Sequence, residues 1–273
     1  MKMGNKSFAN LFRMQLQKVI YNPFFLVAII LQTVAFLIFV FGEYKAFGAV
    51  RDQYLYLLDG SCSVGLGLLV IPILSVLPMA SVKDVSGQKD YFAFIRTSRK
   101  EYLLSECMVA VLSGFLVVCI SALLFILILF LLGYRGVGIG IMDSPGVSGY
   151  SSSCLAVYLS NSKSIVILMM RILILSVYGA AYPMLLLVIS QFTINKYVLL
   201  IGPFLLGKIW SMIVIPLGLQ IYLDPVWQTI YYSAMTGILI TRRLFYEFGF
   251  HIVAIAFLFV LHIFVFVYQS KKS

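Results

Sequence analysis

The chain carries few charged residues and very few acids. Only 11% of its 273 residues are charged, with 20 Lys and Arg against 10 Asp and Glu, whereas a soluble domain has about 25% charged residues. The hydrophobic share is 62% and the mean hydropathy is +1.03, so lipid must solvate part of the apolar surface. The excess of basic residues is typical of segments held at anionic lipid. We do not expect nucleic-acid binding, which needs a basic patch on a folded soluble surface.

Cysteine and histidine are also scarce and form no metal-binding or redox motif. The four cysteines contain no CxxC pair; they are Cys62, Cys107, Cys119 and Cys154. Cys62 and Cys154 could both face outward and pair, although isolated cysteines serve equally well as small apolar residues. The two histidines, His251 and His262, are 11 residues apart. On one helix that is about 16 Å, too far to share a metal ion, so no metal is expected.

Enzyme motifs are missing as well. Residues 202–208 match the first seven positions of a phosphate-binding loop, but Ile209 stands where Ser or Thr should hold magnesium. The segment also lies inside an apolar run instead of following a strand. No Asp or Glu falls inside an expected membrane span, where a membrane protease or acyltransferase would need one. We therefore expect no ATP or catalytic site in this chain, and an intramembrane enzyme or peptide-processing protein is the alternative interpretation.

Long apolar runs are what the sequence does contain. Six of them are long enough to cross about 30 Å of hydrocarbon at 1.5 Å per residue. The first begins too late and runs too long for a cleavable signal peptide. The sequence thus predicts an all-α polytopic membrane protein with six transmembrane helices, at residues 24–42, 61–82, 107–133, 172–194, 197–218 and 248–268.

The orientation follows from the basic residues between the spans. With the N-terminus inside, the inner segments hold 12 Lys and Arg and the outer segments hold 6. Loops on the cytoplasmic side are the ones enriched in Lys and Arg. We expect both termini in the cytoplasm and a location in the cytoplasmic membrane of a bacterium.

The N-terminal stretch predicts a helix that lies in the membrane surface. In residues 8–21 the apolar side chains fall on one helical face and the polar and basic ones mainly on the other. Asn22-Pro23 then ends this helix before the first span. We assign residues 1–23 to a cytoplasmic interfacial helix and residues 24–273 to the transmembrane domain.

Residues 219–247 predict a second surface element, on the outer side. Tyr222, Asp224 and Trp227 belong to a set of aromatic and charged residues that prefers the headgroup level. We expect an outer re-entrant segment of two short helices, broken near Thr236-Gly237, before the last span.

Two basic residues fall within or beside apolar runs. Lys208 lies near the middle of the fifth span, where a charge is costly and marks a functional site by default. Arg171 lies close to the start of the fourth span, where we expect it to extend outward to the headgroups. Pro183, Pro203 and Pro216 should kink the fourth and fifth helices.

The inner loop 83–106 is the most informative segment. It alternates five basic and four acidic residues with an apolar and aromatic set. A plain connector between two spans would not need this pattern. Short amphipathic helices with a charged rim around aromatic anchors suit docking onto a cytosolic partner.

The layout resembles that of the ABC-2-type permeases, the membrane subunits of ATP-binding-cassette exporters. The likeness covers nearly the whole chain, and its local match lies in residues 95–106. There, Ser98, Arg99, Tyr102, Leu103 and Leu104 fit the family's usual run of Pro, hydrophobic, Ser-Arg, two variable residues, Tyr, two hydrophobic residues and Gly-Lys. This chain departs from that run with Thr97 in place of Pro and Ser105-Glu106 in place of Gly-Lys.

The resemblance implies a set of partners and roles. A separate cytosolic ABC ATPase would bind ATP and magnesium, and a second permease copy or a sister permease would complete the path through the lipid bilayer. The family's acidic-then-glycine pattern resembles Asp84 and Gly87, and the implied ATPase-coupling residues in loop 83–106 are Asp84, Gly87, Arg96, Ser98, Arg99 and Tyr102. Lys208 would line the translocation path, and Tyr222, Asp224 and Trp227 would belong to an outer gate. The expected function is export of an amphipathic or hydrophobic peptide, lipid-linked molecule or drug.

Overall fold

The computed structural model describes residues 4–43, 54–63, 67–86, 99–133, 164–193, 195–218 and 237–270. All regular structure within these ranges is helical, as the composition predicts. The helices are α1 (Gly4–Ile20), α2 (Pro23–Glu43), α3 (Tyr54–Ser63), α4 (Gly67–Leu74), α5 (Leu77–Ser86), α7 (Arg99–Leu131), α9 (Ser164–Ser190), α10 (Lys196–Val214) and α13 (Gly237–Ser270).

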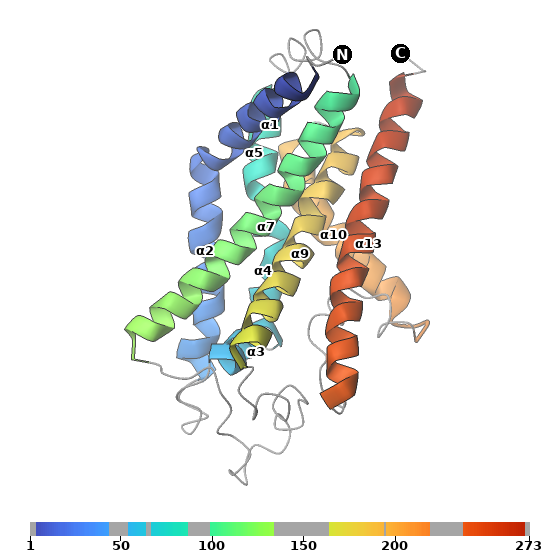
Figure 1. The fold of residues 1–273 in the computed structure, drawn as a ribbon. Helices are drawn as coiled ribbons and strands as arrows, with labels where there is room; N and C mark the ends of the chain where they lie inside the picture. Colours follow the sequence, from blue (N-terminus) through green and yellow to red (C-terminus); the bar gives the residue numbers. More distant parts are fainter. Residues whose placement is uncertain are drawn as a thin grey trace.

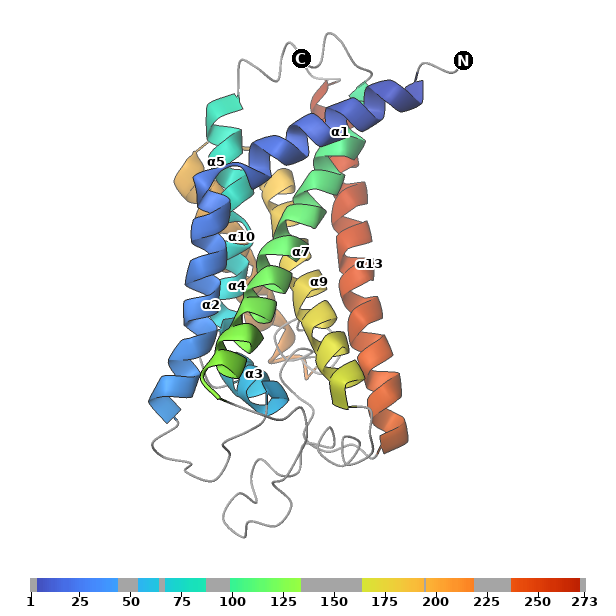
Figure 2. The same ribbon diagram turned by 60° about the vertical axis from the view of Figure 1, so that its left-hand side comes forward.

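The long helices form a bundle with one helix lying across its end (Figure 1). Helices α7 and α9 pack against each other at the centre, with α2 on α7 and with α13 and α10 on α9. Helix α1 crosses the bundle where the last turns of α13 also lie (Figure 2). We call this end, which carries both chain termini, the α1 end.

Four helices are long and apolar enough to cross a membrane, in α7, α9, α10 and α13. A fifth crossing is available if α1 and α2, which meet at a bend of 57°, form one broken span. The all-helical fold is therefore confirmed, and among the described residues four or up to five helices could span a membrane. The expected fourth and fifth spans correspond to α9 and α10, separated by a tight turn.

The turn before α2 forms as the sequence predicts. Pro23 occupies the first helical position, where the missing amide hydrogen costs nothing. The Asn22 side chain accepts a hydrogen bond from the backbone of Phe24 at 3.0 Å, which satisfies one unpaired donor of α2. Its other end donates to the Ser81 hydroxyl at 2.8 Å and fastens the α1–α2 junction to α5.

The expected second span, 61–82, is not one continuous helix. Its residues belong to α3, α4 and α5, with a turn at Ser75-Val76. Pro72 and Pro78 lie on the two sides of that turn and remove the amide donors that would continue the helix. Gly67–Lys83 is accordingly an apolar helical segment too short for a full crossing. Gln32 of α2 donates to the Gly67 carbonyl at 2.9 Å and ties the broken segment to the bundle.

Other helices extend beyond the expected spans. Helix α7 begins at Arg99, α9 at Ser164 and α13 at Gly237. Charged residues near a helix end lower the local hydropathy but do not end the helix, so the apolar runs are shorter than the helices. The prediction that 237–247 forms a separate short helix is wrong, since these residues are the first turns of α13. The rest of the expected outer segment, 219–236, lies outside the described residues.

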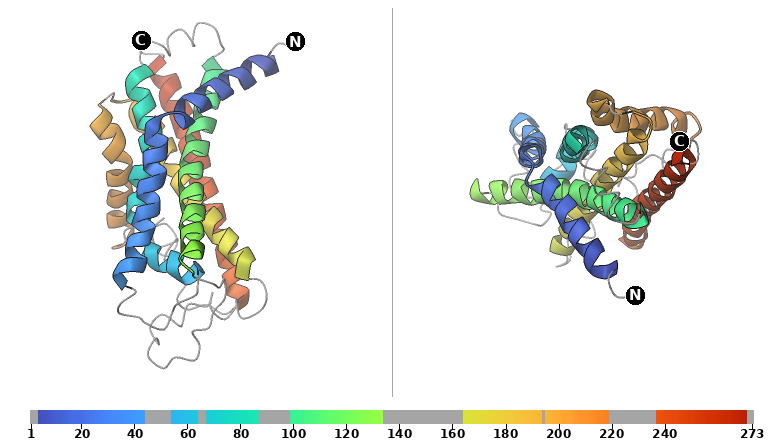
Figure 3. Two further views of the ribbon diagram at one scale, coloured as in Figure 1. Left: turned by 90° about the vertical axis from the view of Figure 1, so that its left-hand side faces the viewer. Right: turned by 90° about the horizontal axis from the view of Figure 1, so that it is seen from above.

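Helices α7 and α9 approach closely at two glycines (Figure 3 shows the bundle from its end). A Cβ on Gly114 would lie 2.7 Å from the backbone oxygen of Gly179 and 2.8 Å from the Pro183 ring. A Cβ on Gly179 would lie 2.4 Å from the Val118 side chain. Small residues at such crossings let helix backbones approach and gain packing contacts that lipid cannot replace.

This packing gives a first prediction. The substitution Gly114→Ala should lower the stability of the protein by about 1–3 kcal/mol, because the added methyl group meets a backbone atom that cannot move aside. The measurement is the apparent melting temperature in detergent, followed by the intrinsic fluorescence of the two tryptophans.

The matched control is Gly249→Ala on α13, where an added Cβ meets nothing within 4 Å. Removing a helical glycine there should leave stability unchanged or raise it slightly. Equal melting temperatures for the two variants would show that the α7–α9 crossing is looser than described.

Candidate functional site

A cluster of polar side chains lies at the α1 end, where α1, α5, α7 and α13 meet. Its centre is Glu106 on α7, which is 5% exposed. A buried carboxylate is costly unless it is paired and hydrogen-bonded. The side chains around Glu106 therefore form the candidate site.

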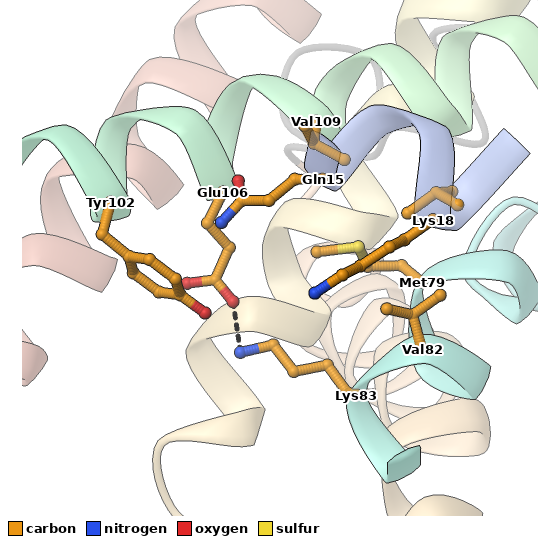
Figure 4. A pocket seen from close by; sticks show the side chains of 9 residues that line it. Gln15, Lys18, Met79, Val82, Lys83, Tyr102, Glu106 and Val109 are labelled. Atoms are coloured by element: carbon orange, nitrogen blue, oxygen red, sulfur yellow. Dashed lines mark ion pairs between the residues drawn. The ribbon is translucent and has the colours of Figure 1, made fainter. Parts of the chain in front are cut away.

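Lys83 at the end of α5 forms an ion pair with Glu106 (Figure 4). The two residues are the first and last of the loop 83–106 on which the docking prediction rests. The ion pair thus joins the base of that loop, holding the end of α5 against the beginning of α7. Within the described residues, α5 ends at Ser86 and α7 begins at Arg99, so the ion pair closes the base of segment 87–98.

His262 brings α13 into the same cluster. Its side chain is fully buried, and its Nε2 lies 3.9 Å from the second carboxylate oxygen of Glu106. Neither ring nitrogen has a hydrogen-bond partner among the described residues. Helix α13 otherwise packs mainly on α9. The approach of His262 to Glu106 therefore brings the final turns of α13 into the cluster formed by α5 and α7.

Helix α1 covers the cluster from the outside. The Ser105 hydroxyl donates a hydrogen bond to the side-chain oxygen of Gln15 on α1. Beside this bond is a small pocket of about 30 Å³ between α1, α5 and α7 (Figure 4). It is lined by Gln15, Lys18, Val19, Met79, Val82, Lys83, Tyr102, Glu106 and Val109. A space of this size with a few polar groups in its lining holds one or two water molecules or a few ligand atoms.

Of the expected coupling residues, Tyr102 belongs to this site. It lies on the first turns of α7, is buried and lines the pocket. Asp84 lies in α5 and Arg99 is the first residue of α7, so the backbone places both close to the base of the loop. Gly87, Arg96 and Ser98 lie outside the described residues, as do Tyr222, Asp224 and Trp227 of the expected outer gate.

Lys208 lies on α10 and does not join this cluster. It is half-buried, with its ammonium 5.9 Å from the centre of the Phe204 ring. A cation over an aromatic face is attracted by the ring, which gives Lys208 a partner on its own helix. Its expected role in the translocation path stays a prediction.

The sequence reading missed Glu106 and His262 as site residues. The sequence analysis placed Glu106 at the end of the inner loop 83–106, in the segment expected to dock onto a partner, and found no acid inside a span. Helix α7 instead begins seven residues earlier, at Arg99, so Glu106 lies within the helix and is buried. The signal was a single acid at one end of the loop and a single base, Lys83, at the other, each directly beside an apolar run.

A second buried polar group lies between α9 and α13. Arg171 is 1% exposed, so the expectation that it extends outward to the headgroups is wrong. Its helix buries most of its surface inside the bundle. His251 packs edge-on against the Tyr178 ring at 5.4 Å, and the Tyr182 hydroxyl donates to that of Tyr178 at 2.7 Å. The ring contact between His251 and Tyr178 thus joins α13 to α9, while the hydroxyl hydrogen bond lies within α9.

No protein-family model, curated protein or solved structure matches this chain. In the described part of the chain, no three His, Cys, Asp or Glu side chains come together as metal ligands. The Glu106 cluster joins side chains of α1, α5, α7 and α13 at the α1 end of the bundle.

The ion pair leads to a second prediction. Lys83→Met should lower stability by roughly 3 kcal/mol, since it leaves the buried Glu106 carboxylate without this cation, and Glu106→Leu should cost less, since the Lys83 side chain is 21% exposed. The double variant should recover most of that loss, because no unpaired charge remains. Apparent melting temperatures of the four proteins in one detergent measure the coupling. Strictly additive losses would mean that the two side chains do not interact.

Proposed function

We propose that this chain is the permease subunit of an ATP-binding-cassette exporter. Its substrate would be an amphipathic or hydrophobic peptide, lipid-linked molecule or drug, moved across the cytoplasmic membrane of a bacterium with ATP hydrolysed by a separate subunit. The observation that supports this best is the Lys83–Glu106 ion pair at the base of segment 87–98. Because the ion pair joins the ends of α5 and α7, a cytosolic protein that binds the charged segment 87–98 could move both helices together.

The helix contacts suggest how such a movement would spread. A force on segment 87–98 acts on the end of α5 and the beginning of α7 together, since the ion pair joins them. Helix α7 passes it to α9 through the glycine crossing. The hydrogen bond from Ser105 on α7 to Gln15 would transmit the movement to α1. The expected mechanism is alternating access, in which the ATPase dimer closes, displaces the loop and rearranges the spans around a site facing a second permease.

The full topology in this proposal has six spans. Helix α2 supplies the first crossing, with α1 lying in the cytoplasmic membrane surface, and the broken set α3, α4 and α5 supplies the second, followed by α7, α9, α10 and α13. The α1 end is then the cytoplasmic side, with both termini inside. The greater number of basic residues in the segments assigned to that side supports this orientation.

Exposed apolar faces support a second permease subunit. Only 22% of the α10 window and 11% of the α13 window are buried inside the chain. Lipid or a partner permease must cover the remainder. Lys208, half-buried on α10, would then line the path between the subunits, and Tyr222, Asp224 and Trp227 would form the outer gate.

The alternative is an intramembrane enzyme or peptide-processing protein. The observation in its favour is the buried approach of His262 to Glu106, a base and an acid in one cluster. That proposal requires catalytic activity in the purified chain alone. The exporter proposal requires that ATP hydrolysis appear only when an ATPase subunit is added.

The third prediction tests the partner. The double charge reversal Arg99→Glu with Asp84→Lys should weaken association with the ATPase encoded beside this gene by about tenfold or more, or ~1.4 kcal/mol. Rim charges at an interface repel once their sign is reversed. The measurements are co-purification from detergent and ATP hydrolysis in nanodiscs.

Lys196→Glu is the matched control. It reverses an exposed charge at the first residue of α10, which lies on the same side of the membrane in the proposed topology. It should leave association unchanged. The exporter proposal fails if all variants bind the ATPase equally well, or if the purified chain turns over a substrate without any partner.

A fourth prediction tests the orientation. With the other cysteines replaced by alanine, Cys154 should react with a membrane-impermeant maleimide on intact cells. A cysteine placed at Ser98 in a chain with Cys154→Ala should react only after the membrane is opened. The reverse pattern would put segment 87–98 outside the cell, where no cytosolic ATPase reaches it.

A further inference from the structure

The pocket beside the Lys83–Glu106 ion pair has an excess of positive charge. Three charged side chains line it, Lys18, Lys83 and Glu106. Lys83 neutralises Glu106 through the ion pair, which leaves Lys18 as the second cation of the lining, with no acidic partner of its own among the described residues. Lys18 makes no hydrogen bond or ion pair with any residue that the structure describes. In Figure 4 its nitrogen points into the pocket, toward the Lys83–Glu106 ion pair.

The remaining polar groups are suited to an anion's oxygen atoms. Gln15 uses its side-chain oxygen to accept the Ser105 hydrogen bond, which leaves its amide nitrogen as a donor. Together with the ammonium of Lys18, this offers a charge-assisted and a neutral hydrogen bond within one pocket. Phosphate oxygens are bound by such combinations. A pocket of about 30 Å³ admits phosphate oxygens while the rest of a ligand stays outside.

The position of the pocket favours a lipid as the source of that phosphate. Helix α1 lies across the bundle end (Figure 2). Met14 on α1 and Tyr21 in the turn after it are exposed, and such apolar and aromatic side chains are typical of a helix at the headgroup level. Lys18 itself is exposed, so the pocket opens at that level. Basic pockets between membrane helices on the cytoplasmic side commonly hold anionic lipid headgroups.

We propose that the pocket between α1, α5 and α7 binds the phosphate of an anionic phospholipid headgroup, with Lys18 as its main cationic ligand. The bound headgroup would bridge α1 to the base of segment 87–98. This inference does not depend on the exporter proposal, because lipid binding by the purified chain requires no ATPase.

The fifth prediction measures that binding directly. The purified chain is loaded with mixtures of phosphatidylglycerol and phosphatidylcholine and examined by native mass spectrometry. The wild type should retain one phosphatidylglycerol preferentially. Lys18→Gln should weaken that retention about tenfold, or ~1.4 kcal/mol, while the melting temperature without added lipid stays unchanged, because Lys18 is exposed and makes no internal bond.

Arg13→Gln is the matched control. Arg13 is exposed on the same helix and does not line the pocket, so this variant loses the same charge from the surface alone and should retain the lipid. Equal losses in both variants would overturn the proposal and leave only general attraction between a basic helix and anionic lipid. So would equal retention of the two lipids by the wild type.

Inorganic phosphate in lipid-free detergent separates the two sources of the ligand. The lipid assignment requires that phosphate alone give little or no rise in melting temperature, since the headgroup is held at the site by its acyl chains in the bilayer. A Lys18-dependent rise with inorganic phosphate, without preferential lipid retention, would overturn the lipid assignment in favour of a soluble anion.

Discussion

A buried carboxylate cannot stand alone in an apolar bundle, and Glu106 is the point at which this constraint shapes the chain. Its burial requires a cation, and Lys83 supplies it from the end of another helix. The cost of separating the two charges fixes where α5 ends relative to α7. The same carboxylate lies 3.9 Å from Nε2 of His262, so the cluster also contacts the final turns of α13, a helix that packs mainly on α9.

Close packing at the centre determines how far any local movement travels. Gly114 and Gly179 bring α7 and α9 together so tightly that an added methyl group would overlap backbone or side-chain atoms. Densely packed helices move as one body, because a small shift has no free volume to enter. By contrast, α10 and α13 bury little of their surface within the chain. The protein thus has a rigid α7–α9 centre and outer helices whose positions depend on polar contacts and on their surroundings.

The sequence predicted those helices and turns that depend on residues close by in the chain. Apolar length located the four long spans, Asn22 and Pro23 located the bend between α1 and α2, and a tight turn separated α9 from α10. Such signals lie within a few residues of the structure they produce. Pro72 and Pro78 were local signals of the broken second span. The apolar run continues through both prolines, so hydropathy alone predicted one unbroken helix.

Burial of the charged residues was not predictable in the same way. Arg171 and Glu106 both lie near the ends of apolar runs, where hydropathy suggests that a charge reaches water. Their burial depends on which helices pack over them, and that is a property of the whole bundle. The expected coupling residues from Gly87 to Ser98 lie outside the described residues, so the sequence remains the only basis for their assignment.

The Glu106 cluster also stands where two environments meet. On one side is the segment 87–98, which in the proposed topology enters the cytosol. On the other is α1, whose Gln15 contacts Ser105 and whose Lys18 reaches the adjoining pocket. A headgroup drawn to Lys18 would pull on the helix that covers the base of the loop, while an ATPase would act on the loop itself. Both forces would act on the Lys83–Glu106 ion pair. The bound lipid would then set the resting position of the bundle, and a cytosolic partner would displace the bundle from that position.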